Sequence, residues 1–110
     1  MKCLTAIELD EMQQREEDFL LVNTLAEEHF DKTKISGAVN IPQQDADFVE
    51  RVEKQAGSKD RLVVVYCADR DCQSSAKAAE QLEEGGFTNV RDFETGAKGW
   101  KETGHRMANV

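Results

Sequence analysis

The sequence has little of the material from which secreted, membrane and metal-binding proteins are built. Its 110 residues include three cysteines, two histidines and a single proline. An odd, sparse set of cysteines does not form a disulfide framework, and two histidines are too few for a zinc site with the usual spacings. No apolar run approaches the roughly 18 residues that cross a bilayer. Because the first residues also lack a signal peptide's apolar stretch, we expect a cytoplasmic protein with reduced cysteines.

Positive charge is scarce as well. The chain has 14 lysines and arginines against 22 aspartates and glutamates, which gives a net charge of -8. This balance argues against nucleic acid and against anionic membranes as partners. Hydrophobic residues make up 39% and charged residues 33% of the chain, as in an ordinary globular protein. The length fits one domain over residues 1–110.

Strand-like and helix-like segments alternate along the chain. Residues 19–22 and 62–66 are apolar runs typical of strands buried on both faces, and residues 90–93 form a further strand. Helical patterns are expected at residues 45–55 and 75–84, each with apolar side chains at helical spacing. This alternation predicts an α/β fold with a mainly parallel sheet. Shorter elements are expected after a capping box at Thr5, at residues 26–30, at residues 37–42 and from residue 95 onward.

Cys67 is the most informative residue. It directly follows the strand expected at residues 62–66, and a short loop then leads to a helix opening at Ser75. Ligands of parallel sheets bind beyond the carboxyl ends of the strands. The N–H groups of such a loop and helix start favour an anion, and a thiolate is an anion. We therefore predict that Cys67 is a nucleophile with a lowered pKa, the alternative being an inert buried cysteine.

Three segments have, in order and spacing, the pattern of a known family. Residues 35–42 are similar to the motif H-I-P-G-A-x-N-I-P, and residues 63–67 with 75–79 are similar to an active-site strand, its cysteine and the next helix. Residues 86–90 and 95–104 are similar to the ending G-F-x-N-V followed by G-G-x-x-x-W. The chain thus resembles a single-domain rhodanese-like sulfurtransferase. This resemblance implies a three-layer α/β/α fold and neither a metal nor an organic cofactor.

The resemblance also implies a reaction. In the family, a cysteine takes a sulfane sulfur from a donor, becomes a persulfide and passes the outer sulfur to a thiophilic acceptor. Cys67 holds the matching position, and donor and acceptor are small molecules or protein-borne groups. The candidate substrate-binding residues of the loop are Ala68, Asp69, Arg70, Asp71, Cys72, Gln73, Ser74 and Ser75. For the two serines, capping of the helix is an alternative role.

The loop departs from the family pattern in charge. Ser74 stands where the family usually has an arginine, and Leu25 stands where the family usually has a second arginine. Asp69 and Asp71 add two carboxylates near the nucleophile. Like charges disfavour a thiolate and repel anionic substrates. We therefore expect a neutral, protein-borne or low-molecular persulfide donor rather than thiosulfate.

Cys72 opens a second functional hypothesis. It lies five residues after Cys67 in the same loop, so it is a candidate resolving thiol that attacks a persulfide or sulfenate on Cys67. The pair would also suit a non-enzymatic redox sensor or binding module. A phosphatase is a weaker alternative, because Gln73 and Ser74 replace the arginine that would hold phosphate.

Overall fold

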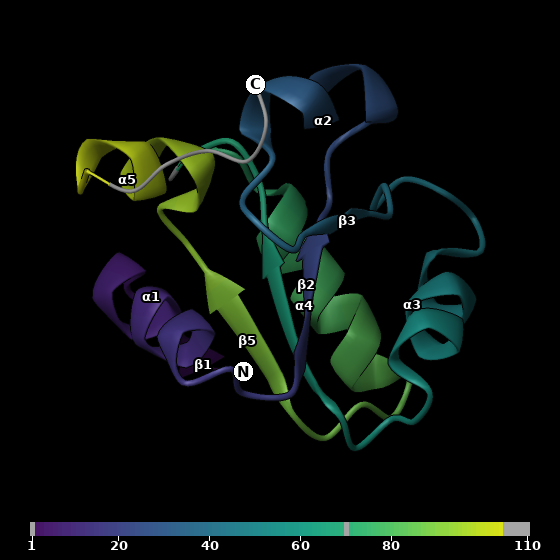
Figure 1. The fold of residues 1–110 in the computed structure, drawn as a ribbon. Helices are drawn as coiled ribbons and strands as arrows, with labels where there is room; N and C mark the ends of the chain where they lie inside the picture. Colours follow the sequence, from purple (N-terminus) through teal and green to yellow (C-terminus); the bar gives the residue numbers. More distant parts are fainter. Residues whose placement is uncertain (1, 70, 105–110) are drawn as a thin grey trace.

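The computed structural model describes residues 2–69 and 71–104 (Figure 1). Strands and helices alternate along almost the whole chain. In chain order they are β1 (Lys2–Cys3), α1 (Ala6–Gln14), β2 (Phe19–Asn23), α2 (Glu27–Thr33), β3 (Val39–Asn40), α3 (Phe48–Ala56), β4 (Leu62–Tyr66), α4 (Ser74–Glu84), β5 (Val90–Phe93) and α5 (Gly96–Glu102). Within the described part, no helix is both long and apolar enough to span a bilayer.

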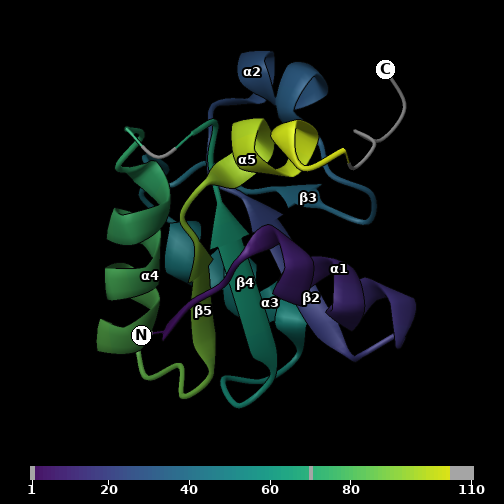
Figure 2. The same ribbon diagram turned by 90° about the vertical axis from the view of Figure 1, so that its left-hand side faces the viewer.

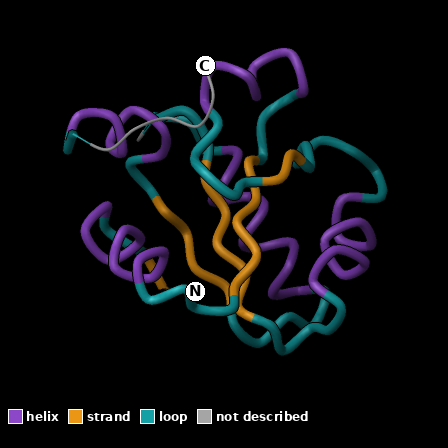
Figure 3. The backbone as a smooth tube through the Cα atoms, in the orientation of Figure 1, coloured by secondary structure: helices purple, strands orange, loops and turns teal. Residues whose placement is uncertain are grey.

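The strands form one sheet at the centre of the molecule (Figure 3). Their order is β1-β5-β4-β2-β3, and every pairing is parallel. β4 therefore lies between β2 and β5, with Val65 opposite both Val22 and Asp92. The expected parallel sheet is confirmed, and its three consecutive valines account for the central place of β4, since both faces of that strand are buried.

Helices cover both faces of the sheet and complete a three-layer α/β/α fold, as the sequence predicted (Figures 1 and 2). One core cluster joins α3 and α4 to the face carrying Val63 and Val65. The other joins α1 and α5 to the face carrying Val64 and Tyr66. Side chains alternate between the two faces along β4, so this alternation sets which helices a residue just after the strand packs against.

Several local signals fix the element ends. The capping box expected at Thr5 is present, with Glu8 reaching back to the Thr5 amide. Tyr66 ends β4, and its buried hydroxyl accepts from the Ile35 amide at 3.0 Å and donates to the Thr33 carbonyl at 2.8 Å. This pair of hydrogen bonds ties the end of the central strand to the segment that follows α2.

Candidate active site

The structure places Cys67 at the carboxyl end of β4, facing α4. Its side chain is fully buried. The first turn of α5 holds the backbone of Cys67 and Ala68 in place. The Ala97 amide donates to the Cys67 carbonyl at 2.9 Å, and the Lys98 amide donates to the Ala68 carbonyl at 2.8 Å. Gly96 approaches the same backbone so closely that a side chain there would overlap it. Two separate elements, β4 and α5, therefore fix the backbone of Cys67.

The surroundings of the Cys67 sulfur favour a thiol rather than a thiolate. Sγ lies 3.4 Å from the Cys72 carbonyl oxygen and 3.5 Å from the Ser75 hydroxyl, with the Asp69 carbonyl oxygen at 4.0 Å. Burial first, and then the neighbouring Cys72, raise the pKa of Cys67 to about 11, although the Ser75 hydroxyl and amide lower it. The expected lowering of the Cys67 pKa is therefore wrong for this conformation.

Two backbone N–H groups of the loop bind the protein's own carboxylate. One carboxylate oxygen of Asp69 accepts from the amides of Asp71 and Cys72, each at 3.0 Å. Two of the loop amides that were expected to hold a thiolate or a substrate anion are thus occupied by the Asp69 carboxylate. For the remaining amides of this loop, binding of the sulfur or of an anion stays a prediction.

The two serines that open α4 have different surroundings, and neither caps the helix. Ser74 is the first residue of α4, and its hydroxyl lies 2.8 Å from the Thr24 hydroxyl and donates to the Thr24 carbonyl at 3.0 Å. Ser75 is buried against Cys67. The residue at the cap position is Gln73, which makes no side-chain capping bond. The capping interpretation of the serines is therefore wrong, because both hydroxyls face other elements.

A pocket of about 930 Å³ opens at this edge of the sheet. Cys72 and Ser74 contribute to its wall, whereas the buried Cys67 does not line it. The described lining residues are Thr24, Leu25, Ala26, Glu27, Glu28, His29, Phe30, Asn40, Pro42, Gln44, Asp45, Arg51, Cys72 and Ser74. Cys72 is thus the thiol that a molecule in the pocket meets first.

Comparison with known proteins decides the family. Residues 5–103 match the family described as Rhodanese-like domain. The chain belongs to this family. Comparison with curated proteins gives no match.

Solved rhodanese structures have the same fold as this rhodanese-like domain. The solution structure of the rhodanese-like domain of an Anabaena sp. protein has a TM-score of 0.84 at 22% identity, over 100% of this chain and 80% of that chain. Thiosulfate sulfurtransferase from Pseudomonas aeruginosa has a TM-score of 0.84 at 22% identity, over 96% of this chain and 20% of that chain. A rhodanese with anions from E. coli has a TM-score of 0.63 at 28% identity, over 74% of this chain and 89% of that chain.

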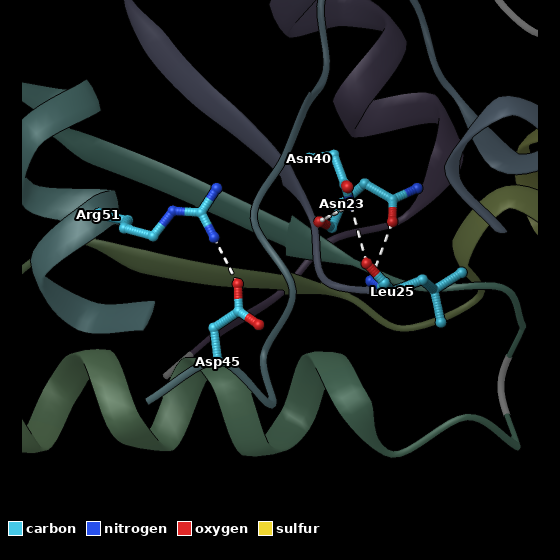
Figure 4. A network of polar contacts seen from close by, with 5 residues as sticks. All are labelled: Asn23, Leu25, Asn40, Asp45 and Arg51. Carbon is cyan, nitrogen blue, oxygen red and sulfur yellow. Dashed lines mark hydrogen bonds and ion pairs between the residues drawn. The ribbon is translucent and has the colours of Figure 1, made fainter. Parts of the chain in front are cut away.

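The charge of the pocket in this rhodanese-like domain is mostly negative. Glu27, Glu28 and Asp45 line it, and Arg51 forms an ion pair with Asp45 (Figure 4). The arginine is therefore already partnered within the wall. Leu25, at a position where the family usually has an arginine, adds an apolar side chain. The described wall thus offers an incoming anion little net attraction.

Amide side chains order the backbone beside this pocket (Figure 4). Asn40 donates to the Leu25 carbonyl at 2.8 Å and to the Asn23 carbonyl at 3.2 Å. The Asn23 side chain is buried, accepts from the Leu25 amide at 3.0 Å and donates to the Thr33 hydroxyl at 2.9 Å. These bonds fix the turn after β2 and give Asn23 a structural role.

The structure brings only part of the predicted site together. Cys67, Cys72 and Ser75 are in contact, and Asp69 orders the loop between them. Ser74 reaches the pocket, whereas the Asp71 and Gln73 side chains are exposed. Ala68 is half-buried beneath α5. Arg70, a candidate substrate-binding residue, lies outside the described residues.

Sequence reasoning missed one buried ionisable group near Cys67. Asp92 in β5 is 3% exposed, and its Oδ1 has no hydrogen-bond partner among the described residues. Burial raises the pKa of Asp92, and a hydrogen bond from Ser75 lowers it. A signal was present, because alternation along the strand places Asp92 on the same face as the buried Val90.

Proposed function

We propose that this rhodanese-like domain is a sulfurtransferase that carries sulfane sulfur on Cys67. The observation that supports this most is a reduced thiol at the carboxyl end of the central strand, in contact with the loop and the first turn of α4. In parallel α/β sheets this is the edge where ligands bind. The low cysteine content agrees with a reducing compartment, so we place the reaction in the cytoplasm.

The first chemical step exchanges one sulfur–sulfur bond for another. The Cys67 thiolate attacks the outer sulfur of a persulfide R–S–SH, the bond between the two donor sulfurs breaks, and R–S⁻ leaves. Cys67 then carries S–SH, and an acceptor thiolate removes the outer sulfur and regenerates the Cys67 thiolate. Since Sγ is fully buried, the loop that carries Cys72 has to move before a donor reaches Cys67.

The charge of the site supports a neutral or protein-borne donor. Asp69 occupies two loop amides, and the pocket wall carries Glu27, Glu28 and an Asp45–Arg51 ion pair. Thiosulfate is a dianion, so it would find these two amides occupied and would meet like charges. We propose donors such as a neutral alkyl persulfide or a persulfide carried by another protein.

Cys72 can complete the reaction in the absence of an external thiol acceptor. Its thiolate can attack the inner sulfur of the Cys67 persulfide, which forms a Cys67–Cys72 disulfide and releases HS⁻. The contact between the two residues favours a second candidate function as well. A redox sensor would form the same disulfide after oxidation of Cys67 to a sulfenate, with release of water and no persulfide stage.

Intact-mass analysis separates these functions. We expect the wild type to gain one sulfur atom from a neutral persulfide donor and Cys67→Ser to gain none. Cys72→Ser should retain the sulfur longer, because the resolving thiol is gone. If no donor adds sulfur but a mild oxidant forms the Cys67–Cys72 disulfide, the sensor function is favoured. If Cys67→Ser still gains sulfur, Cys67 is not the carrier.

A further inference from the structure

An ion pair links two segments in the wall of the pocket. Arg51 in α3 and Asp45 in the loop before α3 both line the pocket of about 930 Å³, and the Arg51 guanidinium points to the Asp45 carboxylate (Figure 4). The loop backbone is held at this point, because the Asp45 amide donates to the Pro42 carbonyl at 3.2 Å and the Phe48 amide donates to the Asp45 carbonyl at 3.1 Å. The Arg51 and Asp45 side chains are 42% and 41% exposed, so the pair is accessible to a molecule in the pocket.

Arg51 is the group of this wall that is best suited to hold an anion. The described lining residues include one arginine and no lysine, beside the carboxylates of Glu27, Glu28 and Asp45. A guanidinium is always charged and can bind an oxyanion through two parallel hydrogen bonds. In the structure, Nη1 of Arg51 instead donates to Oδ2 of Asp45. The cation that an anionic sulfur donor would use is therefore paired with a carboxylate of the protein.

We propose that Asp45 is a specificity-determining residue, which selects against anionic sulfur donors by holding the Arg51 guanidinium. To bind Arg51, an anion such as thiosulfate has to displace the Asp45 carboxylate, which then shares the wall with Glu27 and Glu28 without a cation to offset them. A neutral donor needs no cation, so the ion pair does not disfavour it. The inference rests on the proposed function in taking this pocket as the approach to Cys67.

A second carboxylate of the protein occupies hydrogen-bond donors at the same site. Asp69 accepts from the amides of Asp71 and Cys72, each at 3.0 Å, and Cys72 lines the same pocket as Arg51. Guanidinium groups and clustered backbone amides are both groups that bind oxyanions in proteins. Here an aspartate of the chain occupies an example of each, one in the loop before α3 and one in the loop after β4. Two separate segments therefore disfavour the same class of donor.

The reaction of Cys72 with charged and uncharged disulfides tests the inference. The background is a chain in which Cys72 is the sole cysteine, made by Cys3→Ser and Cys67→Ser. The Cys72 thiolate attacks a symmetric disulfide R–S–S–R, a Cys72–S–S–R bond forms, and R–S⁻ leaves. The probes are dithiodipropionate, which is a dianion, and its uncharged diamide, and intact mass follows both rates. We expect Asp45→Asn to raise the ratio of the dianion rate to the diamide rate about threefold to fivefold, which is the size of an exposed ion pair. Asp45→Ala should do the same and serves if Asp45→Asn does not fold.

Arg51→Met is the decisive control, and Asp47→Asn is the matched one. In the Arg51→Met chain, Asp45→Asn should change the ratio by less than about twofold, because no guanidinium is released. Asp47 lies in the same loop, is exposed and is not among the described lining residues, so Asp47→Asn should also change the ratio by less than about twofold.

An unchanged ratio in Asp45→Asn would overturn the proposal. An equal rise in the Arg51→Met chain or in Asp47→Asn would also overturn it, since the effect would then belong to net charge alone. Because disulfide exchange at Cys72 needs no sulfane sulfur and no Cys67, failure of this test is distinct from failure of the mass experiment.

Discussion

Replacement of Gly96 by alanine should destabilise the domain by acting directly on the backbone beneath the nucleophile. Gly96 has a φ of +61°, a conformation that side chains disfavour. A Cβ there would lie 2.2 Å from the Cys67 carbonyl oxygen and 2.9 Å from the carbonyl carbon. Neither atom can move freely, because the α5 amide of Ala97 binds the same carbonyl.

The expected loss combines two effects. The left-handed conformation costs about 1–2 kcal/mol with a side chain, and overpacking of a fixed interior costs about 1–3 kcal/mol more. Gly96→Ala should therefore lower the free energy of unfolding by about 2–5 kcal/mol, a large share of the roughly 5–15 kcal/mol of a typical domain. Gly37→Ala is the matched control, since Gly37 has a φ of +85° but no atom within 4 Å of its added Cβ. It should lose only about 1–2 kcal/mol.

Urea unfolding measures both variants. Trp100 is the only tryptophan and is 3% exposed, so its fluorescence reports the packing of α5 beside the site. Equal losses for Gly96→Ala and Gly37→Ala would refute the close approach of α5 to the Cys67 carbonyl. A larger loss of unfolding free energy in Gly96→Ala than in Gly37→Ala would support it.

Three further substitutions probe separate features. Tyr66→Phe should lower the free energy of unfolding by about 2 kcal/mol or more, because it leaves two buried backbone groups without their hydroxyl partner; a loss below about 0.5 kcal/mol in urea unfolding would contradict those bonds. Asp69→Asn should raise turnover of thiosulfate relative to a neutral persulfide, since the carboxylate charge in the loop is removed. The exposed Asp71→Asn is its control, and an equal gain there would assign the effect to general charge. Asp92→Asn should stabilise the fold near pH 7, because burial raises the pKa of Asp92 from 3.8 and its ionisation disfavours the folded state. This gain should shrink as the pH falls through the raised value and disappear below about 3.8, and a gain that persists in acid would contradict it.

The arrangement of the sheet could be predicted from the sequence because local patterns and the buried core agree. Three consecutive valines predicted the central strand β4, and its length placed Cys67 at the carboxyl end. β1 was missed, since two residues near the terminus have no pattern of their own and become a strand only by pairing with β5. Long-range pairing of that kind is invisible in a short sequence window.

The electrostatics of the site could not be predicted in the same way. Whether loop amides face a sulfur or a carboxylate depends on backbone torsions of a few residues, and here Asp69 binds the amides of Asp71 and Cys72. The roles of the serines were hidden for a similar reason. The Ser74 hydroxyl hydrogen-bonds to Thr24, which follows β2, so this hydroxyl is not available to cap α4. Both outcomes depend on partners distant in the chain or on loop geometry.

The bonds around Cys67 indicate which part of the loop would have to move in the proposed reaction. The α5 amides hold the Cys67 and Ala68 carbonyls, and β4 continues into the same backbone, so the backbone of Cys67 is anchored. Beyond that point, the bonds that the Asp69 carboxylate makes to the Asp71 and Cys72 amides hold the loop. These bonds are half-exposed or exposed and can exchange with water at little cost. Access to the buried sulfur therefore requires release of the Cys72 segment from Asp69, while α5 and β4 keep Cys67 in place.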